Sequence, residues 1–144
     1  MIQWAPKDTT NHQDHVIAHV IGASVLGYFI LDETLYLLLD IGFIWIIYLD
    51  CEMVLLPHPV ATAELEVNRE VREKIQADVD LLMQNGSAEN GLNLMKPAPA
   101  LCVLTAVTLF ESDDGRRLLL TGQDANLSIE TTISNREIRV VEFR

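Results

Sequence analysis

The sequence predicts an α+β fold, predominantly antiparallel β, in which a curved sheet or partly closed barrel packs against one main α-helix at about residues 69–85. Two observations predict it. Apolar side chains recur at every second position through residues 35–53, which is the period of a β-strand, and further strand signals follow residue 100. Between these regions one stretch has the apolar spacing of an amphipathic helix. Sheet, helix and sheet therefore follow one another along the chain.

The length of 144 residues is that of one domain. We divide residues 1–144 into a sheet-rich part (15–67), the helix (69–85), a loop (86–99) and a second sheet-rich part (100–144). With 49% hydrophobic residues, a chain of this length needs no disulfide or metal to fold. Cys51 and Cys102 lie far apart in the chain. Cys51 falls on the apolar face of its segment and Cys102 lies among apolar residues, so we expect both to be buried thiols.

The charge excludes some partners. The net charge is −11, and residues 1–66 contain nine acidic residues against Lys7 alone. An acidic surface repels phosphate groups, so we expect no nucleic-acid partner and no binding to anionic membranes. The N-terminus lacks the basic and apolar regions of a signal peptide, which predicts a cytoplasmic location with reduced thiols.

The segment LYLLLDIGFIWIIYLDCEMVLLP, residues 35–57, is the most hydrophobic. Acidic residues interrupt it too often for a membrane helix. Its odd positions from Leu35 to Met53 are all apolar, and its even positions hold every charge, which predicts strand with one buried face. Ile44 and Ile46 make the even face partly apolar too, so we expect the helix or another subunit to cover it.

A strand of this length must bend or turn. We favour a bend at Asp40 and Gly42, because the apolar phase continues unshifted through Gly42. A tight turn over residues 40–42 is the alternative.

Residues 16–31 are rich in β-branched side chains and predict a strand, which Asp32-Glu33 joins to the strand beginning at Thr34. A helix over residues 10–21 is the alternative, because Thr10 and Gln13 fit a capping box.

Residues 60–67 alternate and fit either a strand or an early start to the helix. Asn68 can cap the helix, and Asn85-Gly86 can end it. Its apolar stripe consists of Val71, Ile75, Val79 and Leu82. After the loop we predict strands at residues 101–110, 116–121, 127–133 and 137–143, with turns at 113–115 and 134–135.

Histidines offer the best candidate for a metal site. His12, His15 and His19 would share one face of a helix, and three imidazoles suit zinc, nickel or copper. No fourth ligand has a diagnostic spacing, and a surface segment that contains histidines is the simpler interpretation.

A second candidate site consists of the acids Asp40 and Asp50 with Tyr48. Close carboxylates can divide the acid and base roles of hydrolysis. Charges at even positions also fit a strand whose even face is exposed to solvent, and this interpretation is the simpler one.

Two classes of function fit these observations. The first is a homo-oligomeric structural or interaction protein, with a dimer favoured, because the doubly apolar strand needs cover and no catalytic signature is present. The second is a small-molecule or metal-binding domain, with hydrolysis as the reaction, in which His and Asp residues meet near a barrel mouth or interface cleft. Residue types alone do not decide whether the protein is an enzyme.

Overall fold

A computed structural model of the chain describes residues 3–49, 59–85, 91–98 and 102–143. Its elements, in chain order, are β1 (Ala5–Pro6), α1 (Asn11–Val20), β2 (Val25–Leu31), β3 (Thr34–Leu39), β4 (Ile44–Tyr48), the 3-10 helix η1 (Thr62–Glu64), α2 (Arg69–Asn85), β5 (Lys96–Pro97), β6 (Leu104–Ser112), β7 (Gly115–Gly122), β8 (Asn126–Thr132) and β9 (Ile138–Phe143).

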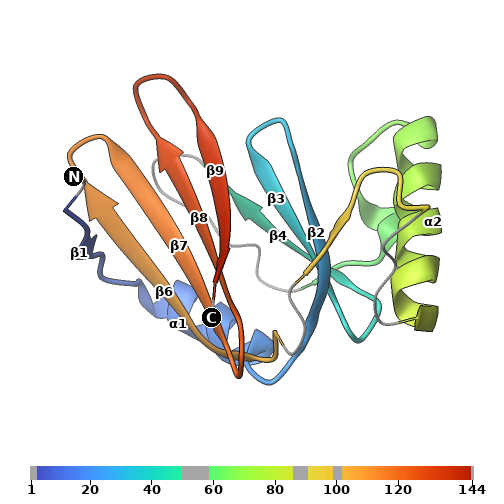
Figure 1. Cartoon of the computed structure of the whole chain (residues 1–144), viewed down its shortest axis with the longest axis horizontal. Helices are drawn as coiled ribbons and strands as arrows, with labels where there is room; N and C mark the ends of the chain where they lie inside the picture. The colour runs from blue at the N-terminus through green and yellow to red at the C-terminus, as the bar shows by residue number, and fades with distance from the viewer. Residues whose placement is uncertain (1–2, 50–58, 86–90, 99–101, 144) are drawn as a thin grey trace.

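The strands form two antiparallel sheets (Figure 1). One sheet has the order β1-β6-β7-β8-β9 and the other the order β4-β3-β2-β5. The helix α2 lies on the side of the four-stranded sheet that faces away from the five-stranded sheet (Figure 1). The α+β fold with antiparallel strands is confirmed. The partly closed barrel is not, because neither sheet closes on itself.

The two sheets form a wedge. At its narrow end the chain crosses between them, where the Val25 N–H donates to the Cys102 carbonyl (3.0 Å) and the Leu104 N–H to the Ala23 carbonyl (2.9 Å). At the wide end, Glu33 on the β2–β3 turn and Arg136 on the β8–β9 turn form an ion pair of 3.7 Å. The helix α1 lies at the narrow end, with its apolar face between the sheets (Figure 1).

The buried side chains form two clusters, one on each side of the four-stranded sheet. The cluster between the two sheets includes Val16, Tyr28, Leu35, Leu37, Trp45, Ile47, Leu118, Leu120, Leu127 and Ile129. The cluster between the four-stranded sheet and α2 includes Phe29, Leu38, Ile44, Ile46, Ile75, Val79 and Leu82. A single chain therefore covers both faces of this sheet.

The predicted bent strand over residues 35–53 is wrong in its connection. The chain turns back after Leu39, and β3 pairs with β4 as an antiparallel hairpin. Gly42 has a φ of +84° in this turn, a conformation that glycine adopts without strain. Trp45 is buried as predicted, whereas Phe43 is 44% exposed because it lies at the hairpin end.

The N-terminal half of the predicted strand over residues 16–31 is also wrong, because the alternative helix forms. The Thr10 hydroxyl accepts from the Gln13 N–H (3.1 Å), and the Gln13 side chain accepts from the Thr10 N–H (2.9 Å). This capping box satisfies two N–H groups at the start of α1. The strand β2 begins only at Val25.

The predicted main helix is confirmed as α2. The Asn68 side chain caps it by accepting from the Val71 N–H at 2.8 Å, and its apolar stripe packs on the four-stranded sheet. The segment before it is neither strand nor helix start: Val60 makes one bridge to Ile44, and η1 follows. No helix in the described ranges is long and apolar enough to cross a membrane.

The C-terminal strands form at the predicted positions within a few residues. The predicted loop over residues 86–99 contains the short strand β5, which pairs with β2.

Candidate functional site

The candidate carboxylate site does not assemble around Asp40 and Tyr48. Asp40 is exposed in the β3–β4 turn, whereas Tyr48 is at the other end of β4, opposite Thr34. These positions are separated by the length of β3, whose six residues span about 20 Å. Asp50 lies outside the described residues. The structure therefore separates the two described members of the set.

The three histidines lie on α1, and two of them meet. The Nε2 atoms of His15 and His19 are 3.3 Å apart, and their rings are in edge contact. His12 is exposed one turn earlier. Across the described ranges, no three His, Cys, Asp or Glu side chains gather closely enough to hold a metal ion.

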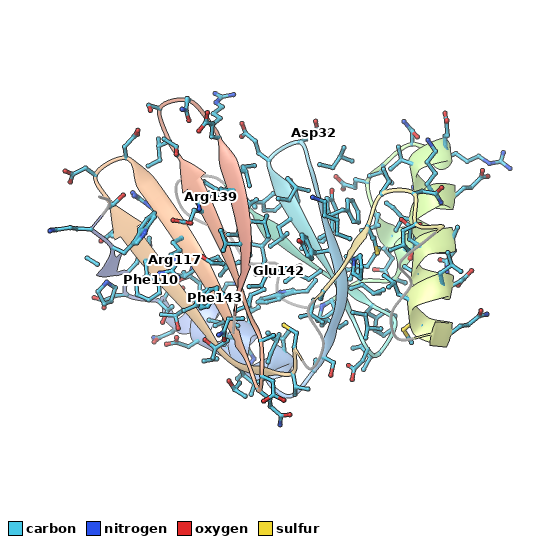
Figure 2. All side chains as sticks on the ribbon, in the orientation of Figure 1. Asp32, Phe110, Arg117, Arg139, Glu142 and Phe143 are labelled. Atoms are coloured by element: carbon cyan, nitrogen blue, oxygen red, sulfur yellow. The ribbon has the colours of Figure 1, made fainter. Side chains whose placement is uncertain are left out.

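The outer face of the five-stranded sheet is a feature that the sequence pattern did not single out. Its inner face packs in the core between the sheets, and its outer side chains include two central ladders that each cross four strands. The first ladder is Phe110, Arg117, Glu130 and Arg139, and the second is Thr108, Leu119, Ser128 and Val141. Phe143, at the end of β9, extends this face (Figure 2).

Arg117 is held in place on this outer face (Figure 2). Its guanidinium carbon lies 5.4 Å from the centre of the Phe110 ring, and its Nε donates to the Ser128 hydroxyl at 2.8 Å. A cation on an aromatic face and a hydrogen bond together fix the guanidinium in one orientation. Its neighbour Glu130 takes part in none of the ion pairs among the described residues.

Two hollows adjoin the outer face. One is a depression of about 390 Å³ on the sheet, which Trp4 flanks and which Arg117, Arg139, Val141 and Phe143 help to line. The other is a groove of about 800 Å³ around the β6–β7 turn, also bordered by Trp4. Its charged lining residues are Glu111, Asp113, Asp114 and Glu130, so the groove is acidic.

Tyr28 on β2 connects the four-stranded sheet to β9, the edge strand of the five-stranded sheet. Its phenol O–H donates to the Glu142 carboxylate at 3.1 Å. Burial, and next the charge and hydrogen bond of Glu142, raise the pKa of Tyr28 from 10.0 to about 12. The phenol therefore stays neutral and acts as a hydrogen-bond donor. Its pKa is far above that of a side chain that could act as a catalytic base at neutral pH.

Asp78 on α2 is a buried carboxylate that sequence reasoning missed. It is 0% exposed, and it accepts from the backbone N–H groups of Asn93, Leu94 and Met95 at 2.7, 2.7 and 2.9 Å. These bonds attach the segment before β5 to the helix. An acidic residue one position before the stripe residue Val79 was the only sequence signal for this role.

No family model, no curated protein and no solved structure matches this chain.

Proposed function

We propose that this protein is a non-enzymatic interaction protein that forms a homodimer through the outer face of its five-stranded sheet. One observation carries the proposal. Among the described elements, the inner sheet faces and the outer face of the four-stranded sheet are covered, whereas the outer face of the five-stranded sheet combines Phe110, Val141 and Phe143 with arginines and has no covering layer. Aromatic residues and arginine are enriched at protein–protein interfaces.

The surface that supports a dimer differs from the one that the sequence predicts. The sequence predicts that the helix or another subunit covers the second face of the doubly apolar strand, and α2 and the five-stranded sheet cover both of its faces within one chain. The surface that supports the dimer is instead the outer face of the five-stranded sheet, where the sequence shows ordinary alternation of apolar and polar residues.

The charge order on the face favours a second copy as the occupant. Arg117, Glu130 and Arg139 lie in register on three neighbouring strands. In a two-fold dimer the same patch faces itself, so a row of positive, negative and positive charges can bring Glu130 of one copy opposite an arginine of the other. The net charge of −11 opposes a nucleic-acid partner on the same face.

The size of the face sets the expected affinity. The width of the patch is that of four strands at a spacing of about 4.8 Å. Its length is that of β8 and β9, which have seven and six residues of about 3.3 Å each, so the patch measures roughly 20 Å by 20 Å. Standard interfaces bury about 800 Å² on each partner, so this patch is small. We expect a dimer that dissociates at micromolar concentration.

Localisation belongs to the same proposal. We place the protein in the cytoplasm, and support comes from Cys102, which is a free and buried thiol. Burial, and next the nearby Glu142, raise the pKa of this thiol, which makes it a poor nucleophile.

Sedimentation velocity over a range of concentrations tests the dimer. We expect the wild-type mass to shift from one chain to two, and Val141→Arg to keep the protein monomeric by replacing an apolar side chain of the patch with a charged one. The matched control is Ile41→Arg, because Ile41 is an apolar residue 60% exposed on the β3–β4 turn. A monomer at every concentration, or a dimer abolished by Ile41→Arg and not by Val141→Arg, would overturn the proposal.

A charge exchange sharpens the test. Glu130→Arg alone and Arg139→Glu alone should each weaken the dimer, whereas the double variant restores opposite charges and should recover much of the affinity. A double variant that is weaker than both single variants would show that these side chains do not face one another across the interface.

A further inference from the structure

The exposed side of α1 carries a pair of imidazoles with an unusual geometry. His15 and His19 are one helical turn apart, their ring centres are 4.8 Å apart, and the ring planes cross at 82°. Their Nε2 atoms lie 3.3 Å apart, at hydrogen-bond distance and exposed, so two potential ligand nitrogens of one helix are already side by side.

The separation of the two nitrogens fits a tetrahedral metal ion. Two nitrogens bound to one zinc ion at about 2.0–2.1 Å with a tetrahedral angle lie about 3.3–3.4 Å apart. Neighbouring corners of a square-planar copper site are closer, at about 2.8 Å. The observed separation of 3.3 Å is the one that two nitrogen ligands of a zinc ion have.

The helix that holds the pair is fixed by its opposite side. Val16 and Val20 are each 1% exposed in the core between the sheets, and the capping box of Thr10 and Gln13 closes the first turn. Because α1 is ordered without a ligand, none of the binding free energy of an ion would be spent on forming the helix.

The charge of the surrounding sequence favours a cation. Lys7 is the one lysine or arginine in residues 1–66, against nine acidic residues. On α1 itself, Asp14 is exposed next to His15 and accepts a hydrogen bond from the Thr9 hydroxyl. A negative field raises the local concentration of divalent cations.

We propose that His15 and His19 form a two-histidine site for a zinc ion, in which water or an external ligand fills the remaining positions. The site lies on α1, whereas the proposed dimer surface is the outer face of the five-stranded sheet. Each proposal can fail without the other.

Calorimetric titration of the untagged full chain with Zn²⁺ tests the site. We expect one ion per chain and a rise in the thermal unfolding midpoint on addition of zinc. His15→Ala and His19→Ala should each weaken binding at least about tenfold, and the double variant should abolish it. Alanine is the best helix former, so these changes do not weaken α1, and circular dichroism of the variants confirms that it remains folded.

His12→Ala is the matched control, because His12 is an exposed histidine of the same helix without a contact to the pair in the structure. It should leave the zinc affinity and the zinc-induced shift unchanged. Three outcomes would overturn the two-histidine site: no saturable binding up to millimolar zinc, wild-type affinity in the double variant, or a loss in His12→Ala equal to that in the double variant.

Discussion

The four-stranded sheet is covered on both faces, whereas the five-stranded sheet is covered on one. The difference is visible in the side chains. In β3 and β4 both alternating sets are apolar, as Leu37 and Trp45 on one face and Leu38 and Ile44 on the other show. In β7 to β9 the inner set is apolar and the outer set mixes charged, polar and apolar residues. A doubly apolar strand can therefore be covered on both faces within one chain, whereas strands that alternate between apolar and polar residues leave one face open for a partner.

The largest effect on stability should come from the face of the four-stranded sheet that packs against the five-stranded sheet. Trp45 is 0% exposed between the sheets, so Trp45→Ala should lower the free energy of unfolding by about 3–5 kcal/mol. The matched change on the open face is Phe110→Ala, which removes a half-buried ring and its contact with Arg117, and should cost about 1 kcal/mol. Urea melts of both variants measure the difference, and equal losses would mean that the outer face is covered as well.

On the other face of the four-stranded sheet, Asp78 attaches α2 to the segment before β5. Removal of a carboxylate that accepts three buried or half-buried N–H groups leaves them unsatisfied, so Asp78→Ala should cost about 3 kcal/mol. Asp80→Ala is the control on the exposed side of α2 and should change stability by less than about 0.5 kcal/mol. Hydrogen exchange should show faster exchange at Asn93, Leu94 and Met95 in the Asp78 variant alone. Unchanged protection there would exclude this role.

The hydrogen bond between Tyr28 on β2 and Glu142 on β9 predicts a pH dependence. The pKa of Tyr28 is raised in the folded protein from 10.0 to about 12, so its contribution to stability is fully present below pH 10 and is lost as the pH rises toward 12. Tyr28→Phe should cost about 1 kcal/mol at neutral pH through the lost hydrogen bond to Glu142. It should also show a smaller alkaline loss of stability than the wild type. A Tyr28→Phe profile parallel to the wild type would contradict the assignment.

The smallest effect should come from the turns at the wide end of the wedge. Glu33 has a φ of +61°, which is strained for a residue with a Cβ. Glu33→Gly should therefore raise the free energy of unfolding by about 0.5–1 kcal/mol, even though it removes the exposed ion pair with Arg136. Glu33→Ala loses the same ion pair and keeps the strain, so it should not stabilise. A melt in which both variants behave alike would show that the backbone strain at Glu33 is not the cause.

The sequence by itself determined the fold class, the position and cap of α2, and the faces of β3 and β4. It predicted these faces correctly although the connection was wrong, for a geometric reason. Leu37 pairs with Trp45 and Leu35 with Ile47, so residues opposite one another in the hairpin have the same parity. Odd positions therefore stay on one face through the turn, and an alternating pattern is the same for an unbroken strand and for this hairpin.

Only the tertiary structure decided what the faces meet. Val16 and Val20 share parity and also lie one helical turn apart, so they fit strand and helix alike until the capping box and the space between the sheets select the helix. The convergence of His15 and His19, the separation of Asp40 from Tyr48, and the ladder of Phe110, Arg117, Glu130 and Arg139 depend on local conformation and strand register. Residue spacing limits which side chains can share a face, but the register and packing between distant segments decide which of them touch.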